Sequence, residues 1–118
     1  MQNINQLIIE GNMSCDPELR HTSTSKKAVT NFNIYVDSKY KSKNSEAPLY
    51  VKNTSKVPVV AWAGKAKYIS STFNKGDKVR LVGHLKTKEI LIGEQRILTF
   101  EVIAKDLYLI SKSSKNSD

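Results

Sequence analysis

The chain has 118 residues, of which 19 are Lys or Arg and 11 are Asp or Glu, so its formal net charge is +8 at pH 7. This length supports one domain with one modest core, and the positive excess favours a nucleic acid or an anionic membrane surface as the partner. No apolar stretch is long enough to span a membrane and the first residues do not resemble a secretory signal, so we expect a cytoplasmic protein. The single cysteine, Cys15, excludes an internal disulfide and is expected to be a small buried residue.

Apolar residues recur with a period of two along most of the chain, which is typical of strands whose side chains alternate between two faces. Residues 6–12 predict a first strand, and Asp16-Pro17-Glu18 predicts the turn after it because proline fixes its backbone angle. A second strand is expected over residues 29–36. Its core-facing side chains would be Phe32, Ile34 and Val36.

Residues 37–55 break this pattern with lysines, serines and a proline, and we expect a long, mobile, basic loop or ribbon there. A third strand is predicted over residues 57–62, and both of its faces are substantially apolar. Because a closed core needs only one apolar face, the other must meet a ligand, a loop or a subunit. The face that carries the only tryptophan consists of Lys56, Pro58, Val60 and Trp62.

A short helix should follow, because Ala66, Ile69 and Phe73 recur at helical spacing and Lys75-Gly76 is typical of a helix end. This helix would be inserted between the third and fourth strands.

The fourth strand, residues 78–88, has the clearest alternation in the chain. Val79, Leu81 and Leu85 would point into a core, and a row of basic side chains would point outward. A fifth strand is expected over residues 97–104. The folded domain would cover residues 1–110, and residues 111–118 would form a short, disordered polar tail. The outward row of the fourth strand comprises Lys78, Arg80, His84, Lys86 and Lys88.

Five strands with one short helix between strands 3 and 4 are the order expected of an all-β OB-fold, a Greek-key barrel that binds oligonucleotides across its outer face. Six short segments carry a more specific signal through their order and spacing. They are residues 7–12 (LIIEGN), 16–20 (DPELR), 32–34 (FNI), 59–65 (VVAWAGK), 73–79 (FNKGDKV) and 82–87 (VGHLKT). Over residues 3–110 the chain thereby resembles the bacterial-type single-stranded DNA-binding protein family.

The resemblance implies roles for individual residues in DNA binding. Trp62 would stack on a base, Tyr40 in the basic loop would be a second stacking residue, and Arg20 would lie near backbone phosphates. The basic residues of the fourth strand are favoured both by the resemblance and by the alternation. The complete expected set is Arg20, Tyr40, Lys56, Val60, Trp62, Arg80, Lys86 and Lys88.

The chain departs from the family pattern at two places. Lys56 and Ile90 stand where reference members carry aromatic residues, so we expect fewer stacked bases and binding that is more sensitive to salt. Many members also end in an acidic tip with a terminal aromatic residue that recruits replication and repair proteins. This chain ends in Ser-Lys-Asn-Ser-Asp, which puts that recruitment in doubt.

The resemblance implies a protein that coats and protects single-stranded DNA during replication, recombination and repair. It also implies a homotetramer, located in the cytoplasm and associated with the nucleoid. Two alternatives stay open: a primosomal-type OB-fold protein that mainly binds another protein, and an RNA-binding OB-fold, because stacking and phosphate contacts do not separate RNA from DNA.

An enzyme is disfavoured by the sequence. No glycine-rich phosphate loop, nucleophile elbow or metal-binding cluster is present, and His21 and His84 have no partners at metal-ligand spacing. We therefore expect no catalytic residues, no cofactor and no metal.

Overall fold

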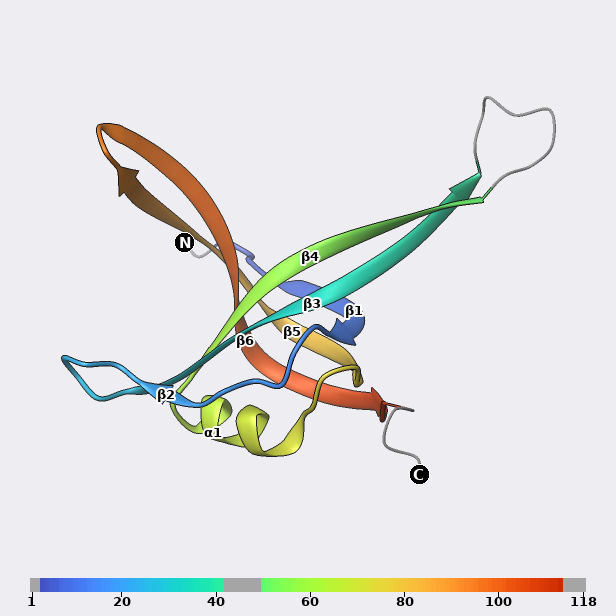
Figure 1. Ribbon diagram of the computed structural model, residues 1–118, viewed down its shortest axis with the longest axis horizontal. Coiled ribbons are helices and arrows are strands. Elements are labelled where there is room, and N and C mark those ends of the chain that lie inside the picture. The colour runs from blue at the N-terminus through green and yellow to red at the C-terminus, as the bar shows by residue number, and fades with distance from the viewer. Residues whose placement is uncertain (1–2, 42–49, 114–118) are drawn as a thin grey trace.

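The computed structural model describes residues 3–41 and 50–113, with side chains for residues 3–38 and 53–113. Its strands form one sheet in the order β1-β5-β6-β4-β3-β2, and β1 also pairs with β3. This arrangement confirms the expected all-β OB-fold, with one helix between the third and fourth long strands (Figure 1). The elements are β1 (Leu7–Met13), β2 (Arg20–His21), β3 (Ala28–Lys41), β4 (Tyr50–Trp62), α1 (Ala63–Thr72), β5 (Lys78–Ile92) and β6 (Gln95–Ser111).

The barrel closes through β1, which pairs with two strands at once. It runs antiparallel to β5 from Leu7 to Asn12, and its last two residues pair with β3. At this crossing Gly11 lies against β3 so closely that a Cβ atom there would be 2.2 Å from the carbonyl oxygen of Tyr35. Glycine is therefore required for β1 to bridge the two strands.

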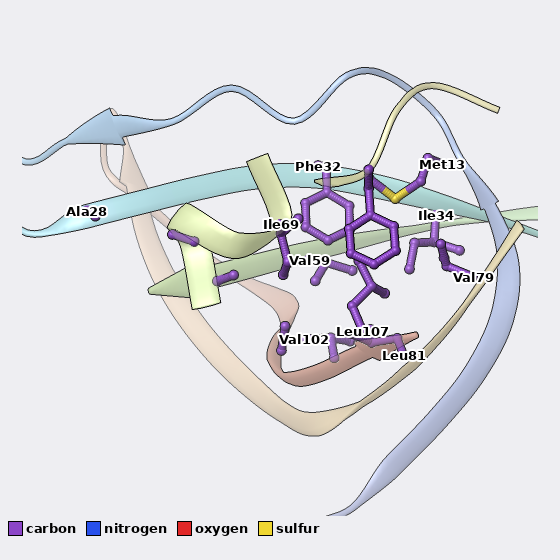
Figure 2. Packing of buried hydrophobic residues seen from close by; sticks show 14 residues of the cluster. Met13, Ala28, Phe32, Ile34, Val59, Ile69, Val79, Leu81, Val102 and Leu107 are labelled. Atoms are coloured by element: carbon purple, nitrogen blue, oxygen red, sulfur yellow. The ribbon is translucent and has the colours of Figure 1, made fainter. Parts of the chain in front are cut away.

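The core lies inside the barrel and is closed at one end by α1 (Figure 2). Val59, Val79 and Leu81 point inward from the strands and are at most 1% exposed. From the helix, Ala66 and Ile69 are buried against them, as the helical spacing predicted. The helix thus contributes its apolar face to the same core as the sheet.

Two hairpins extend away from the barrel (Figure 1). β3 and β4 pair continuously from Val29 opposite Trp62 to Lys41 opposite Tyr50. The segment expected as a basic loop or ribbon is therefore a two-stranded ribbon over residues 37–41 and 50–55, and its remainder, residues 42–49, lies outside the described residues.

The second arm is formed by β5 and β6, which pair as far as Ile92 opposite Gln95. The prediction that Leu85 lies in the core is wrong, because its side chain is 42% exposed. The pairing of β1 with β5 ends at Leu7 opposite Gly83, so β5 has left the barrel when it reaches Leu85. The side chain of Asn5 replaces the missing strand partner by bonding the N–H of Leu85 at 3.0 Å and its carbonyl oxygen at 2.8 Å.

Two further expectations are corrected by the local backbone. Cys15 is exposed rather than buried, because β1 ends at Met13 and the chain then turns over the surface. The helix ends at Thr72, earlier than Gly76, since Phe73 already has an extended backbone. Gly76, with φ of +89°, belongs instead to the turn after the helix, where its N–H donates a hydrogen bond to the carbonyl oxygen of Met13.

Gly11→Ala is expected to lower the free energy of unfolding by about 1–3 kcal/mol or more, because the new methyl group meets a backbone atom that cannot move without opening the barrel. The matched control is Gly64→Ala, since a Cβ at Gly64 would have no atom within 4 Å. That helical substitution should be neutral or stabilising by up to about 1 kcal/mol. Denaturant unfolding of both variants measures the difference, and equal stabilities would contradict the close crossing.

Candidate nucleic-acid interface

The strand register brings outward-facing side chains from several strands together on one face. Arg20 of β2 lies opposite Val29 of β3, which lies opposite Trp62 of β4. In the next row, Val60 lies between Asn31 and the parallel β6. Residues that are far apart in the sequence therefore become neighbours on the outside of the barrel.

These side chains surround a shallow hollow of about 260 Å³, which we call the outer depression. Four of the eight expected DNA-binding residues line it, including the only tryptophan. The complete lining is Arg20, Val29, Asn31, Val60, Trp62, Lys88 and Glu101.

Trp62 is 42% exposed, whereas its neighbours Val60 and Ala61 are 5% and 0% exposed. It is the last residue of β4 and precedes α1 with an extended backbone. The following residue, Ala63, has φ of +55°, so the chain turns into the helix while the indole stays on the outside. A purely core role for Trp62 is thereby excluded, and Val60 forms the floor of the depression.

Arg20 is held in place by Asn31, whose side-chain oxygen accepts a hydrogen bond from its guanidinium group at 2.9 Å. Because this acceptor is neutral, the bond orients the guanidinium group without cancelling its charge. Lys88, on the other side of the depression, is exposed and has no ion-pair partner in the part of the chain that the structure describes. Glu101 adds one negative charge, so the lining carries a net charge of +1 from two cations and one anion.

The other expected residues lie elsewhere. Lys56 and Lys86 are exposed on β4 and β5 but do not line the depression. Arg80 is also exposed, but its Nε donates a hydrogen bond of 2.7 Å to Glu10 of β1, and its Nη2 lies 2.6 Å from the same carboxylate oxygen, an ion pair that compensates its charge. Tyr40 pairs with Val51 through its backbone, and its side chain lies outside the described residues.

Two polar residues of the depression were absent from the expected set. Asn31 belongs to the outward side of the second predicted strand, so the alternation contained a signal for it. Glu101 faces outward from β6 opposite Lys86, and only the strand register reveals that it enters a basic surface.

Within residues 3–41 and 50–113, no three His, Cys, Asp or Glu side chains come close enough to hold a metal ion. No helix in these ranges is long and apolar enough to cross a membrane. The lining of the outer depression offers an aromatic face for stacking, polar groups for hydrogen bonding and cations that attract anions.

The closed barrel, its single helix and the outward indole beside two cations define an OB-fold protein with a nucleic-acid-binding type of surface. Residues 4–110 match the model of the single-strand binding protein family, and the chain belongs to this family. The family expected from the six sequence segments is confirmed.

Individual relatives agree with this assignment. The chain is 30% identical over 115 residues to the single-stranded DNA-binding protein 3 of Streptococcus agalactiae, covering 97% of this chain and 78% of the relative. It is 29% identical over 117 residues to the single-stranded DNA-binding protein of Clostridium tetani, covering 97% and 75%. The fold also resembles the Plasmodium falciparum SSB in its complex with single-stranded DNA, with a TM-score of 0.81, 18% identity and coverage of 94% and 98% of the two chains.

The exposed position of Trp62 among cations predicts how small ions quench its fluorescence. At low ionic strength, the ratio of the iodide to the caesium Stern–Volmer constant should be at least about twofold larger for the free protein than for tryptophan amide, because the local positive potential attracts anions. Neutral acrylamide serves as the control for exposure, and tryptophan amide gives the ratio in the absence of a field. Protection from all three quenchers, or an iodide-to-caesium ratio equal to that of tryptophan amide, would contradict this geometry.

Proposed function

We propose that the protein binds single-stranded DNA without regard to base sequence, and that it coats and protects exposed strands during replication, recombination and repair. The observation that carries this proposal is the half-exposed indole of Trp62 beside Arg20 and Lys88 on the outer face of the barrel. Family membership supports the same function.

Stacking explains the preference for single strands. An unpaired base can place its face on the indole of Trp62, whereas the bases of a duplex are already stacked on one another. Such stacking contributes about 1–3 kcal/mol per base and accepts any base, because every base has an aromatic face. Binding in the outer depression therefore does not require hydrogen bonds to the edges of particular bases.

Attraction of phosphates supplies the second part of the affinity. Arg20 and Lys88 flank the indole, and Lys56 and Lys86 extend the positive charge along β4 and β5. Each phosphate neutralised on a single strand steepens the logarithmic salt dependence by about 0.7. Tyr40 and Arg80 complete the proposed set, with Arg80 contributing less because Glu10 compensates its charge.

The proposed activity is binding alone, without hydrolysis, in the cytoplasm and on the nucleoid. The lining of the outer depression supports binding without hydrolysis. Its only acidic residue, Glu101, lies among cations rather than beside a nucleophile. An acid in this setting limits the affinity for a polyanion, and we assign it no catalytic role.

Oligo-deoxythymidine should quench the fluorescence of Trp62 strongly, and a duplex of equal length should have little effect. Trp62→Ala should lose about 1–3 kcal/mol of affinity, measured by anisotropy of a labelled oligonucleotide, while the fold is retained. The matched control is Tyr68→Ala, which removes a similarly exposed aromatic residue of α1 that does not line the outer depression. Equal affinity for duplex and single strand, or no loss of affinity in Trp62→Ala, would refute the proposal. Tighter binding of oligouridine than of oligo-deoxythymidine would show that RNA is the preferred ligand.

We also infer that the protein assembles as a homotetramer, as the family resemblance implies. Residues 7–10 of β1 pair only with β5, so their other side is an open sheet edge among the described residues. On the outer face, Ile8 of β1 is 60% exposed beside this edge, and Tyr108 of β6, which β5 separates from β1, is 53% exposed. Open edges and exposed apolar side chains favour association, and several subunits on one strand would raise the affinity through avidity.

Ile8→Lys should reduce the mass of the assembly, because it places a charge on the proposed subunit contact. Light scattering coupled to size-exclusion chromatography measures that mass, with four chains expected for the unmodified protein. Leu91→Lys is the control, since Leu91 is 68% exposed but lies near the tip of the β5–β6 arm. A monomeric unmodified protein would reject the assembly, and an equal effect of both substitutions would place the contact elsewhere.

A further inference from the structure

Trp62 borders two further hollows besides the outer depression, one on each side of the start of α1. The first, which we call the turn groove, has a volume of about 720 Å³ and lies between α1 and the turn that joins β2 to β3. The second, the helix–β6 groove, has a volume of about 600 Å³ and lies between α1 and β6. Trp62 therefore lies where three hollows of the surface meet.

The two grooves differ in charge. Lys27 and Lys67 line the turn groove, no acidic residue lines it, and neither lysine has an ion-pair partner within the described ranges. In the helix–β6 groove, Lys65 donates a hydrogen bond of 2.9 Å to Asp106. That hydrogen bond and the negative charge of Asp106 raise the pKa of Lys65, which stays charged but is compensated. Of these two grooves, only the turn groove is lined by uncompensated cations.

The turn that carries Lys27 is ordered before any ligand arrives. The N–H of Thr22 donates to the carbonyl oxygen of Lys27 at 3.0 Å, and the N–H of Lys27 donates to the Thr22 hydroxyl at 3.0 Å. That hydroxyl also lies 2.9 Å from the hydroxyl of Ser25. A backbone fixed in this way lowers the entropy lost on binding, because fewer groups must be ordered by the ligand.

The second lysine is placed by the barrel core. Lys67 is exposed on α1, while Ala66 and Ile69 of the same helix are buried against the sheet. The position of the Lys67 backbone is therefore set by packing that does not involve the ligand. The two lysines come from different elements and line the same groove, with Trp62 on its border.

The turn groove adjoins the outer depression at Trp62. β2 has only two residues, and it places Arg20 in the depression while the turn groove begins at Thr22. Trp62 is shared by both hollows. We propose that the DNA strand passes from the outer depression across Trp62 into the turn groove, where Lys27 and Lys67 bind its phosphates. This inference rests on the proposed function and extends the interface by two residues.

The test compares Lys27→Gln/Lys67→Gln with the unmodified protein in binding to oligo-deoxythymidine at several salt concentrations. Loss of two phosphate contacts should reduce the slope of log affinity against log salt by about 1.4, because each contact contributes about 0.7. Quenching of Trp62 at saturation should be retained, since the indole is untouched. Thermal unfolding should also be unchanged, because both lysines are exposed.

The matched control is Lys75→Gln/Lys112→Gln, which removes the same net charge from exposed positions at the other end of α1 and after β6. Its slope should stay within error of the unmodified protein. An unchanged slope in Lys27→Gln/Lys67→Gln, or an equal decrease in the control, would refute the proposal that the turn groove binds phosphates. If the unmodified protein bound no oligo-deoxythymidine, the proposed function itself would fail, so the two failures are distinguishable.

Discussion

The closure of the barrel by β1 is the constraint on which the rest of the structure depends. One strand of seven residues pairs with β5 along most of its length and with β3 at its end. Within the closed barrel, alternate side chains of each strand point to opposite faces. One set fills the core and the other set lies on the outside. Gly11 makes this possible because only a residue without a side chain fits against the backbone of Tyr35.

The outward indole follows from this closure together with the turn into α1. Ala63 adopts a left-handed backbone, which costs a residue with a Cβ atom about 1–2 kcal/mol. Such strain persists only where the surrounding structure fixes it, and here the buried face of α1 and the last pairs of β4 hold both ends. The result keeps Trp62 at the junction of the outer depression and the turn groove rather than in the core.

The sequence predicted the fold and the family well, because these depend on alternation and on short segments that are local in the chain. It also placed Val79 and Leu81 correctly in the core. Alternation failed at Leu85 because it reports which face a side chain is on but not where a strand leaves the barrel. Alternation could not show whether Trp62 faces the core or the outside, since both faces of that strand are apolar. The pairing with Val29 and the turn at Ala63 place its side chain on the outside.

The charges show the same limit of local reasoning. By sequence alone, Arg80 and Lys88 are equivalent members of one basic row on β5. In the structure Arg80 is paired with Glu10, because β1 runs beside that part of β5, whereas Lys88 lies beyond the end of β1 and has no such partner among the described residues. Each ion pair removes a cation from the surface that a polyanion can use.

The net charge of +8 favours a polyanion as ligand, and the distribution of acidic partners is what the proposed path of the DNA strand depends on. Asp106 compensates Lys65 on one side of α1, and no acidic residue borders the turn groove on the other side. On the proposed path, a base stacks on the indole of Trp62 while Arg20 on one side and Lys67 on the other bind the neighbouring phosphates. In the proposed path, the pairing of Lys65 and the lack of acidic partners for Lys27 and Lys67 select the side of α1 that the strand follows.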